Sequence, residues 1–218
     1  MHTFLIAPLI PIIVVVAILI GGSILFLGKL SPSNATRIAI LGSKSVGKTT
    51  LWNQLRNRFD GSRTTVGIES LEQFEIEHNG KTKTIISPKD YSGDQDLVKQ
   101  YDDVIQKDTF IYYLIDLTTL QEKKSDTRAR IQKIFQVIKS KSLKESEFGF
   151  KLVATHYNDY FNQTAKTREE ALTDLLQIID LNSIEGIKIE ERINENIIVA
   201  ELTNPDEINQ FRKEIIEF

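Results

Sequence analysis

The sequence contains no cysteine and only three histidines among its 218 residues. Without cysteine the chain forms no disulfide and offers no thiolate to a metal, and this absence suits a reducing compartment. Because the histidines are scattered along the chain, a zinc site is not expected. An excess of basic residues is also lacking, since the net charge is −3, so nothing in the composition suggests nucleic acid as a partner.

The most informative stretch that is present covers residues 42–49, Gly-Ser-Lys-Ser-Val-Gly-Lys-Thr, which fit the phosphate-binding pattern G-x-x-x-x-G-K-[ST]. The two glycines at fixed positions allow backbone angles and close approaches that a Cβ atom would block. Backbone N–H groups can then surround a phosphate at the N-terminus of the next helix. The residues expected to bind the nucleotide here are Gly42, Lys44, Ser45, Val46, Gly47, Lys48, Thr49 and Thr50.

The sequence around this loop has the order that a phosphate-binding loop requires. Residues 37–41 are predicted to form a buried strand, and residues 48–58 a helix. Lys48 is expected to place its charge at the β- and γ-phosphates and to assist catalysis, and the Thr49 hydroxyl to ligate Mg²⁺. We therefore predict a nucleotide-binding loop rather than an accidental glycine turn.

A second feature is an uncharged run of 24 residues over residues 4–27. As a helix rising 1.5 Å per residue, it is long enough to cross a hydrocarbon core of ~30 Å. A cleaved signal peptide is disfavoured because residues 1–3 contain no lysine or arginine, and a buried core helix because the run is apolar all round. We expect a single-pass membrane anchor over residues 1–29, followed by a polar linker over residues 30–35.

The charges beside this span indicate its orientation. Lys29 and Arg37 follow the span, whereas His2 is the only basic residue before it. The positive-inside rule then places residues 36–218 in the cytoplasm, where nucleoside triphosphates are abundant.

Residues 36–218 alternate between strand and helix patterns. Residues 79–80 are Asn-Gly, the favoured turn of a β-hairpin, so the strands beside them are expected to pair antiparallel. The other strands are expected to be parallel, with ligands bound beyond their carboxyl ends. This predicts an α/β domain with a mostly parallel six-stranded sheet and helices on both faces. The expected strands cover residues 37–41, 71–78, 83–87, 110–117, 148–155 and 196–200, and the expected helices cover 48–58, 125–141, 167–179 and 205–218.

The order of these elements resembles that of Ras-like small GTPases, in particular the ADP-ribosylation factor group and the membrane-anchored β subunit of the signal recognition particle receptor. The resemblance covers about residues 36–218. It implies a G domain that binds GTP or GDP with Mg²⁺ and acts as a nucleotide-dependent switch. It also implies that loops 60–68 and 90–107 change with the γ-phosphate and contact a protein effector or receptor subunit.

Two loops resemble the switch motifs of this family. Residues 64–68, Thr-Thr-Val-Gly-Ile, resemble its Thr-x-Gly stretch, which implies that Thr65, or Thr64 as the alternative, ligates Mg²⁺ and senses the γ-phosphate. Residues 90–93, Asp-Tyr-Ser-Gly, resemble its D-x-x-G motif. The resemblance implies that Asp90 reaches Mg²⁺ through water and that the Gly93 amide bonds the γ-phosphate.

The chain departs from the family directly after this motif. Many relatives have a glutamine there that orients the attacking water, whereas this chain has Asp94, followed by Gln95. Both remain candidates for the catalytic role. Because a carboxylate repels a γ-phosphate, we expect GTP hydrolysis that is slow or needs a partner. The alternative is a non-hydrolysing GTP-binding recruitment module at the membrane.

The guanine-reading loop, Asn-Lys-x-Asp in the family, also differs. Direct alignment places Thr155 and His156 at its first two positions and Asn158 at the position of the reading aspartate, whereas a slip of one residue restores Asp159. This difference leaves an ATP-using P-loop protein as a further alternative. The loop after the last strand, residues 200–203, is expected to act through its backbone groups.

Overall fold

The structure is a computed structural model that describes residues 35–57, 73–86, 101–180 and 196–218. The predicted membrane anchor lies outside these ranges. No helix within them is long and apolar enough to cross a bilayer. Six predicted site residues also lie outside the described ranges and stay predictions, namely Thr64, Thr65, Asp90, Gly93, Asp94 and Gln95.

A six-stranded sheet with the order β2-β3-β1-β4-β5-β6 forms the centre of the domain. Three neighbouring pairs of strands, β1 with β4, β4 with β5 and β5 with β6, are parallel. Their carboxyl ends therefore meet at one edge of the sheet, where the fold class binds its ligands. These strands are β1 (Ala35–Gly42), β4 (Thr109–Asp116), β5 (Phe148–Thr155) and β6 (Ile197–Val199).

The predicted hairpin is confirmed. β2 (Gln73–His78) and β3 (Lys81–Ile86) pair antiparallel, and β2 forms the edge of the sheet. At the turn Asn79 has φ 51° and Gly80 has φ 72°. Positive φ at both central residues is what a type I′ turn needs, which explains the Asn-Gly sequence.

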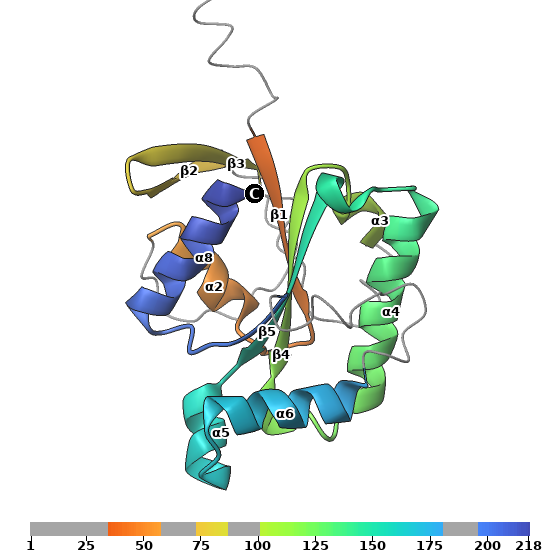
Figure 1. Cartoon of the computed structure of the whole chain (residues 1–218), viewed down its shortest axis with the longest axis vertical. Helices are drawn as coiled ribbons and strands as arrows, with labels where there is room; N and C mark the ends of the chain where they lie inside the picture. The colour runs from red at the N-terminus through yellow and green to blue at the C-terminus, as the bar shows by residue number, and fades with distance from the viewer. Residues whose placement is uncertain (1–34, 58–72, 87–100, 181–195) are drawn as a thin grey trace, which may run out of the picture. The chain divides into compact units, whose positions relative to one another are not determined.

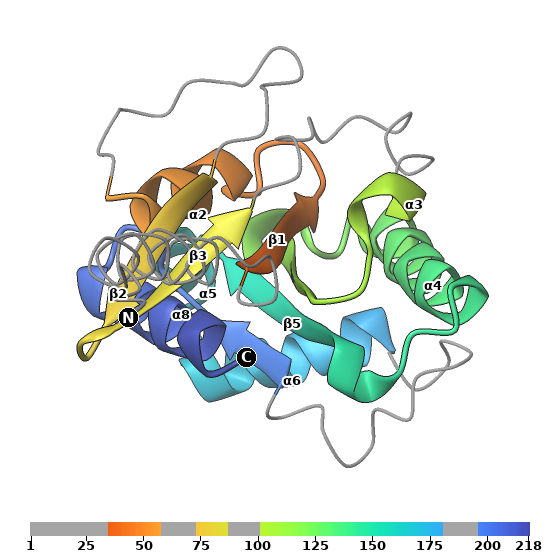
Figure 2. The same cartoon turned by 90° about the horizontal axis from the view of Figure 1, so that it is seen from above.

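Helices cover both faces of the sheet, as Figures 1 and 2 show. One face carries α2 (Lys48–Leu55) and α8 (Pro205–Glu217), and the other carries α3 (Tyr101–Val104), α4 (Lys124–Ser140) and α6 (Arg168–Ile179). The remaining elements are the 3₁₀ turns η3 (Leu117–Thr119) and η4 (Glu145–Glu147) and the helix α5 (Tyr157–Thr164).

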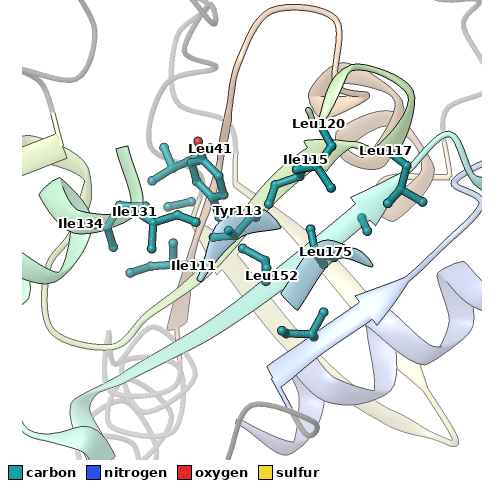
Figure 3. Close-up of a cluster of buried hydrophobic side chains, with 14 of the residues drawn as sticks. Leu41, Ile111, Tyr113, Ile115, Leu117, Leu120, Ile131, Ile134, Leu152 and Leu175 are labelled. Atoms are coloured by element: carbon teal, nitrogen blue, oxygen red, sulfur yellow. The ribbon is translucent and has the colours of Figure 1, made fainter. Parts of the chain in front are cut away.

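Alternation along β4 divides the core into two clusters. Phe110, Tyr112 and Leu114 are buried with residues of α2 and α8. Ile111, Tyr113 and Ile115 point to the other face and are buried with residues of α4 and α6, a cluster drawn in Figure 3. Since successive side chains of a strand point to opposite faces, an unbroken apolar run such as β4 predicts burial on both sides.

Most helix boundaries follow from local signals. Asn204 caps α8 by accepting a hydrogen bond from the backbone N–H of Asp206, with Pro205 as the first helical residue. Thr167 and Glu170 form a capping box at the start of α6. The predicted end of α2 was wrong, since the helix ends at Leu55 rather than at residue 58, and the helices α3 and α5 were missed.

Candidate nucleotide-binding site

The loop between β1 and α2 has the backbone of a phosphate-binding loop. Gly42 has φ 141°, and a Cβ atom there would lie 2.5 Å from the carbonyl oxygen of Leu114. Gly47 has φ 91°, and a Cβ atom there would lie 2.7 Å from Cδ1 of Leu202. Both fixed glycines of the pattern are thus required by close contacts with β4 and with the loop after β6.

The N-terminus of α2 is suited to an anion. Its N-cap residue is Gly47, which has no side chain to occupy the backbone N–H groups at the helix start. The first turn of α2 contains no acidic residue. The positive end of the helix therefore meets no carboxylate of its own first turn. Lys44 and Ser45 are exposed on the loop, and Ser45 also has a positive φ of 64°. Successive backbone N–H groups in such conformations form an anion-binding concavity.

Lys48 lies within this loop rather than in solvent. Its side chain is buried, and Nζ donates hydrogen bonds to the carbonyl oxygens of Gly42 (3.1 Å) and Ser43 (2.6 Å). These contacts hold the ammonium group against the loop that would surround the phosphates. Thr49 and Thr50, in the first turn of α2, are partly exposed.

Thr155 connects the end of β5 to the phosphate-binding loop. Thr155 is 1% exposed, and its hydroxyl lies 3.0 Å from the carbonyl oxygen of Val46, 3.1 Å from that of Ile115, and 2.9 Å from Nδ1 of His156. A hydrogen bond to Val46 spans 109 residues of sequence. Thr155 therefore positions the predicted base-reading segment against the phosphate-binding loop.

The residues that follow form a helix rather than the predicted loop. His156 is the N-cap of α5 in a left-handed conformation with φ 60°, so Asn158 and Asp159 lie in the first helical turn, and both are exposed. The side chain of His156 is one third exposed, and its Nδ1 lies 3.7 Å from Asp116 Oδ1. Helical geometry fixes the register here, because successive residues point about 100° apart. The side chains of Asn158 and Asp159 therefore point in different directions, so Asp159 does not occupy the position that Asn158 takes in the direct alignment.

The loop after β6 approaches this turn through a side chain, which the sequence analysis did not foresee. Glu201 accepts a hydrogen bond from the backbone N–H of Asn158 through Oε2 (3.3 Å) and one from the Thr203 hydroxyl through Oε1 (3.0 Å). Residues 200–203 therefore contribute a carboxylate beside the predicted base-reading segment.

A partly buried ion pair supports the phosphate-binding loop from α4. The Ser43 hydroxyl donates to Asp126 Oδ2 (3.3 Å), and the same oxygen accepts a hydrogen bond from Arg130 Nε (2.7 Å). Arg130 is 4% exposed and lies beside Tyr101. Burial raises the pKa of Tyr101, and the charge and hydrogen bond of Arg130 oppose that shift.

The predicted Mg²⁺ ligands are not brought together among the described residues, because of the three only Thr49 belongs to them. The described part of the chain also contains no group of three or more histidine, cysteine, aspartate or glutamate side chains that could bind a metal. What the structure places side by side is the phosphate-binding loop with Thr155 and, beyond it, Asn158 with Glu201.

The solved structures that are similar to this chain include two GTPase structures. One is the Arl6 (BBS3) small GTPase of Trypanosoma brucei with a bound nucleotide analogue, GppNp, at a TM-score of 0.59 and 16% identity, covering 84% of this chain and 98% of that chain. The chain has the fold of a small GTPase. The other is Roco2 RocCORdC of Methanosarcina barkeri bound to GDP, at a TM-score of 0.51 and 15% identity, covering 84% of this chain and half of that one.

The two comparisons confirm the predicted α/β sheet of the small-GTPase type. At 16% and 15% identity they show the fold alone. No protein-family model and no curated protein matches the sequence. The function of this small-GTPase fold must therefore be argued from its own site residues.

Proposed function

We propose that the chain is a small GTP-binding protein that uses GTP and GDP, with Mg²⁺, as a molecular switch. The observation that carries this proposal is the phosphate-binding loop. It combines left-handed Gly47, buried Lys48 and a helix N-terminus without acidic residues in its first turn. The two similar structures, described with GppNp and with GDP, support guanine nucleotides as the ligand class.

In this proposal the protein contributes positioning and charge rather than covalent chemistry. Lys48 would stabilise negative charge on the β- and γ-phosphates. Thr49, together with Thr65 and Asp90, would hold Mg²⁺, which neutralises charge on the phosphate oxygens when it is bound. The Gly93 amide would bond the γ-phosphate, and Asp94 or Gln95 would orient the attacking water. The products are GDP and phosphate.

Nucleotide binding by the full chain in a mild detergent tests this proposal. We expect GTP and GDP to bind in calorimetry with a dissociation constant of about 1 μM or below, and ATP to bind far more weakly. Lys48→Ala should weaken GTP binding about 100-fold, because it removes the charge beside the phosphates. Lys213→Ala, at an exposed lysine of α8 outside the predicted nucleotide-binding set, is the matched control. Absence of guanine-nucleotide binding by the wild type would refute the proposal.

A second candidate is a recruitment module that holds GTP without hydrolysing it. Asp94, at the position of the family's water-orienting glutamine, favours this candidate because a carboxylate repels the γ-phosphate. Phosphate release from the GTP-loaded protein separates the two candidates. Asp94→Gln should raise the rate of release if this position limits hydrolysis. An unchanged rate with GTP still bound would contradict this role for Asp94.

We further propose that residues 4–27 hold the protein in a membrane, with the G domain in the cytoplasm. The support is the 24-residue uncharged run and the basic residues that follow it. The full chain should stay in the membrane fraction at alkaline pH, whereas a chain without residues 2–29 should be released. Release of the full chain under these conditions would contradict a spanning segment.

A further inference from the structure

At the aligned reading position, Asn158 in the first turn of α5, the acceptor pair that guanine needs is lacking. Guanine presents N1–H and a 2-amino group side by side, and two adjacent acceptors such as the oxygens of one carboxylate match this edge. The Asn158 side chain offers one acceptor and one donor group instead. A second source of acceptors is therefore required for this chain to bind guanine selectively.

A carboxylate from the loop after β6 lies beside this position. Glu201 Oε2 is 3.3 Å from the backbone nitrogen of Asn158, and Oε1 is 3.0 Å from the hydroxyl of Thr203. A carboxylate has about four lone-pair sites, two on each oxygen. Each oxygen of Glu201 thus uses one site for these contacts and keeps a second for a further donor.

A hydrogen bond from the backbone of Glu201 to the side chain of Glu207 fixes the position of Glu201. Its N–H donates to Glu207 Oε2 (2.8 Å). Arg168 binds both oxygens of Glu207, with NH1 at 3.1 Å from Oε2 and NH2 at 2.7 Å from Oε1. A planar two-point contact of this kind restricts the angle of Glu207 as well as its distance. The loop that carries Glu201 is therefore held before any ligand binds.

Both loops at this position touch the phosphate-binding loop. Thr155, which lies three residues before Asn158, donates a hydrogen bond to the carbonyl oxygen of Val46 (3.0 Å). Leu202, directly after Glu201, is packed so closely against Gly47 that a Cβ atom on Gly47 would lie 2.7 Å from it. The backbone N–H of Ala200 also donates to the carbonyl oxygen of Ala154 (2.8 Å). The carboxylate is thus tied to the phosphate-binding loop from two sides.

We propose that Glu201 supplies the carboxylate that reads the guanine edge, in place of the aspartate that the family carries on the other loop. Its two oxygens would accept the N1–H and 2-amino hydrogens of the base, with Asn158 aligning the carboxylate through its backbone N–H. The inference rests on the proposed binding of guanine nucleotides at this site. A site built to bond a polar group rejects an analogue that lacks it, because its own buried groups are then left unpaired.

The test compares GTP with inosine triphosphate, which has N1–H but lacks the 2-amino group. In calorimetry the full-length wild type should bind GTP more tightly than inosine triphosphate. Glu201→Gln replaces one acceptor by a donor, so it should weaken GTP binding about 100-fold and bring the ratio of the two affinities close to one. It should also improve binding of xanthosine triphosphate, whose C2 carbonyl can accept from the new amide.

The competing variant is Asp159→Asn, which makes the same chemical change at the rival carboxylate, exposed in the first turn of α5. Its ratio of GTP to inosine triphosphate affinity should equal that of the wild type. Loss of the ratio in Asp159→Asn but not in Glu201→Gln would overturn the proposal in favour of Asp159. Wild-type selectivity in both variants would overturn it as well.

Nucleotide binding by the wild type and by Glu201→Asp distinguishes failure of this inference from failure of the proposed function or of folding. If the wild type binds no guanine nucleotide, the proposed function fails, whereas binding with unchanged selectivity in Glu201→Gln refutes only the inference. Glu201→Asp keeps a carboxylate but withdraws it by one carbon. If Glu201→Gln does not fold, a lower ratio in Glu201→Asp supports the inference, and an unchanged ratio overturns it.

Discussion

Replacing Thr155 by valine tests how strongly the base-reading segment is tied to the phosphate-binding loop. The exchange keeps the β-branched shape and about the same volume, so it opens no cavity. It removes the hydroxyl of a residue that is 1% exposed, and this hydroxyl lies 3.0 Å from the carbonyl oxygen of Val46 and 3.1 Å from that of Ile115. Because one hydroxyl has one proton, a single donated hydrogen bond is lost at any time.

The magnitude follows from leaving a buried carbonyl without its donor. Such a loss costs about 1–3 kcal/mol, since water cannot replace the donor at a buried position. We take about 2 kcal/mol for Thr155→Val. With a slope of roughly 2 kcal/mol per molar urea, the unfolding midpoint should fall by about 1 M with the slope unchanged. GTP binding should weaken about tenfold, because the segment that holds the base is less firmly positioned.

Thr173 provides the matched control for this exchange. Its hydroxyl donates to the carbonyl oxygen of Glu169 (2.9 Å) on the exposed side of α6. Thr173→Val removes a hydrogen bond of the same kind where water can replace it, so the cost should stay below about 0.5 kcal/mol. Urea unfolding followed by circular dichroism measures both variants. Equal losses in the two variants would refute the argument from burial.

Three further predictions concern stability, each measured by chemical unfolding. Asp126→Asn should cost about 3 kcal/mol and more than Arg130→Met, because it leaves the 5% exposed guanidinium without its partner, whereas the partner carboxylate is 37% exposed; the opposite order would contradict this. Gly149→Ala should cost about 1–3 kcal/mol, since a Cβ atom would lie 2.6 Å from the ring of Phe110; an unchanged midpoint would show that the ring yields freely. Burial raises the pKa of Glu207, but hydrogen bonds from an arginine of α6 and a backbone N–H lower it more, so the net pKa is below its usual value. This stabilisation is present above pH about 4.5 and is lost as the pH falls, so Glu207→Gln should flatten the acid side of the stability profile, and an equally steep profile would argue against this source.

The parts of the fold that the sequence predicted correctly depend on neighbouring residues. The phosphate-binding loop is one contiguous pattern, the Asn79-Gly80 turn needs two residues with positive φ, and the start of α8 is specified by its cap and Pro205. The sheet was predictable because its apolar strands alternate with amphipathic helices. Each of these signals lies within a few residues of the structure that it specifies.

What the sequence did not predict depends on contacts between distant residues. Arg130 was missed because a charged residue in an amphipathic helix is expected in solvent, whereas here it is buried and pairs with the partly exposed Asp126. α5 was missed because the family motif suggested a loop over its first residues. The signal for Glu201 was an acidic residue directly after the last strand, but its partner Asn158 lies 43 residues earlier.

The parallel register explains why a base-reading carboxylate can come from either of two loops. Ala154 pairs with Val199, so β5 and β6 end side by side, and the loops that follow them begin at the same height on the sheet. A side chain from either loop then reaches the same point beside the phosphate-binding loop. Thr155 and Leu202 hold both loops against the phosphate-binding loop, so the proposal needs only that the carboxylate move from the loop after β5 to the loop after the neighbouring strand β6. Under this proposal, selectivity for guanine requires a carboxylate at this edge of the sheet, and either loop can carry it.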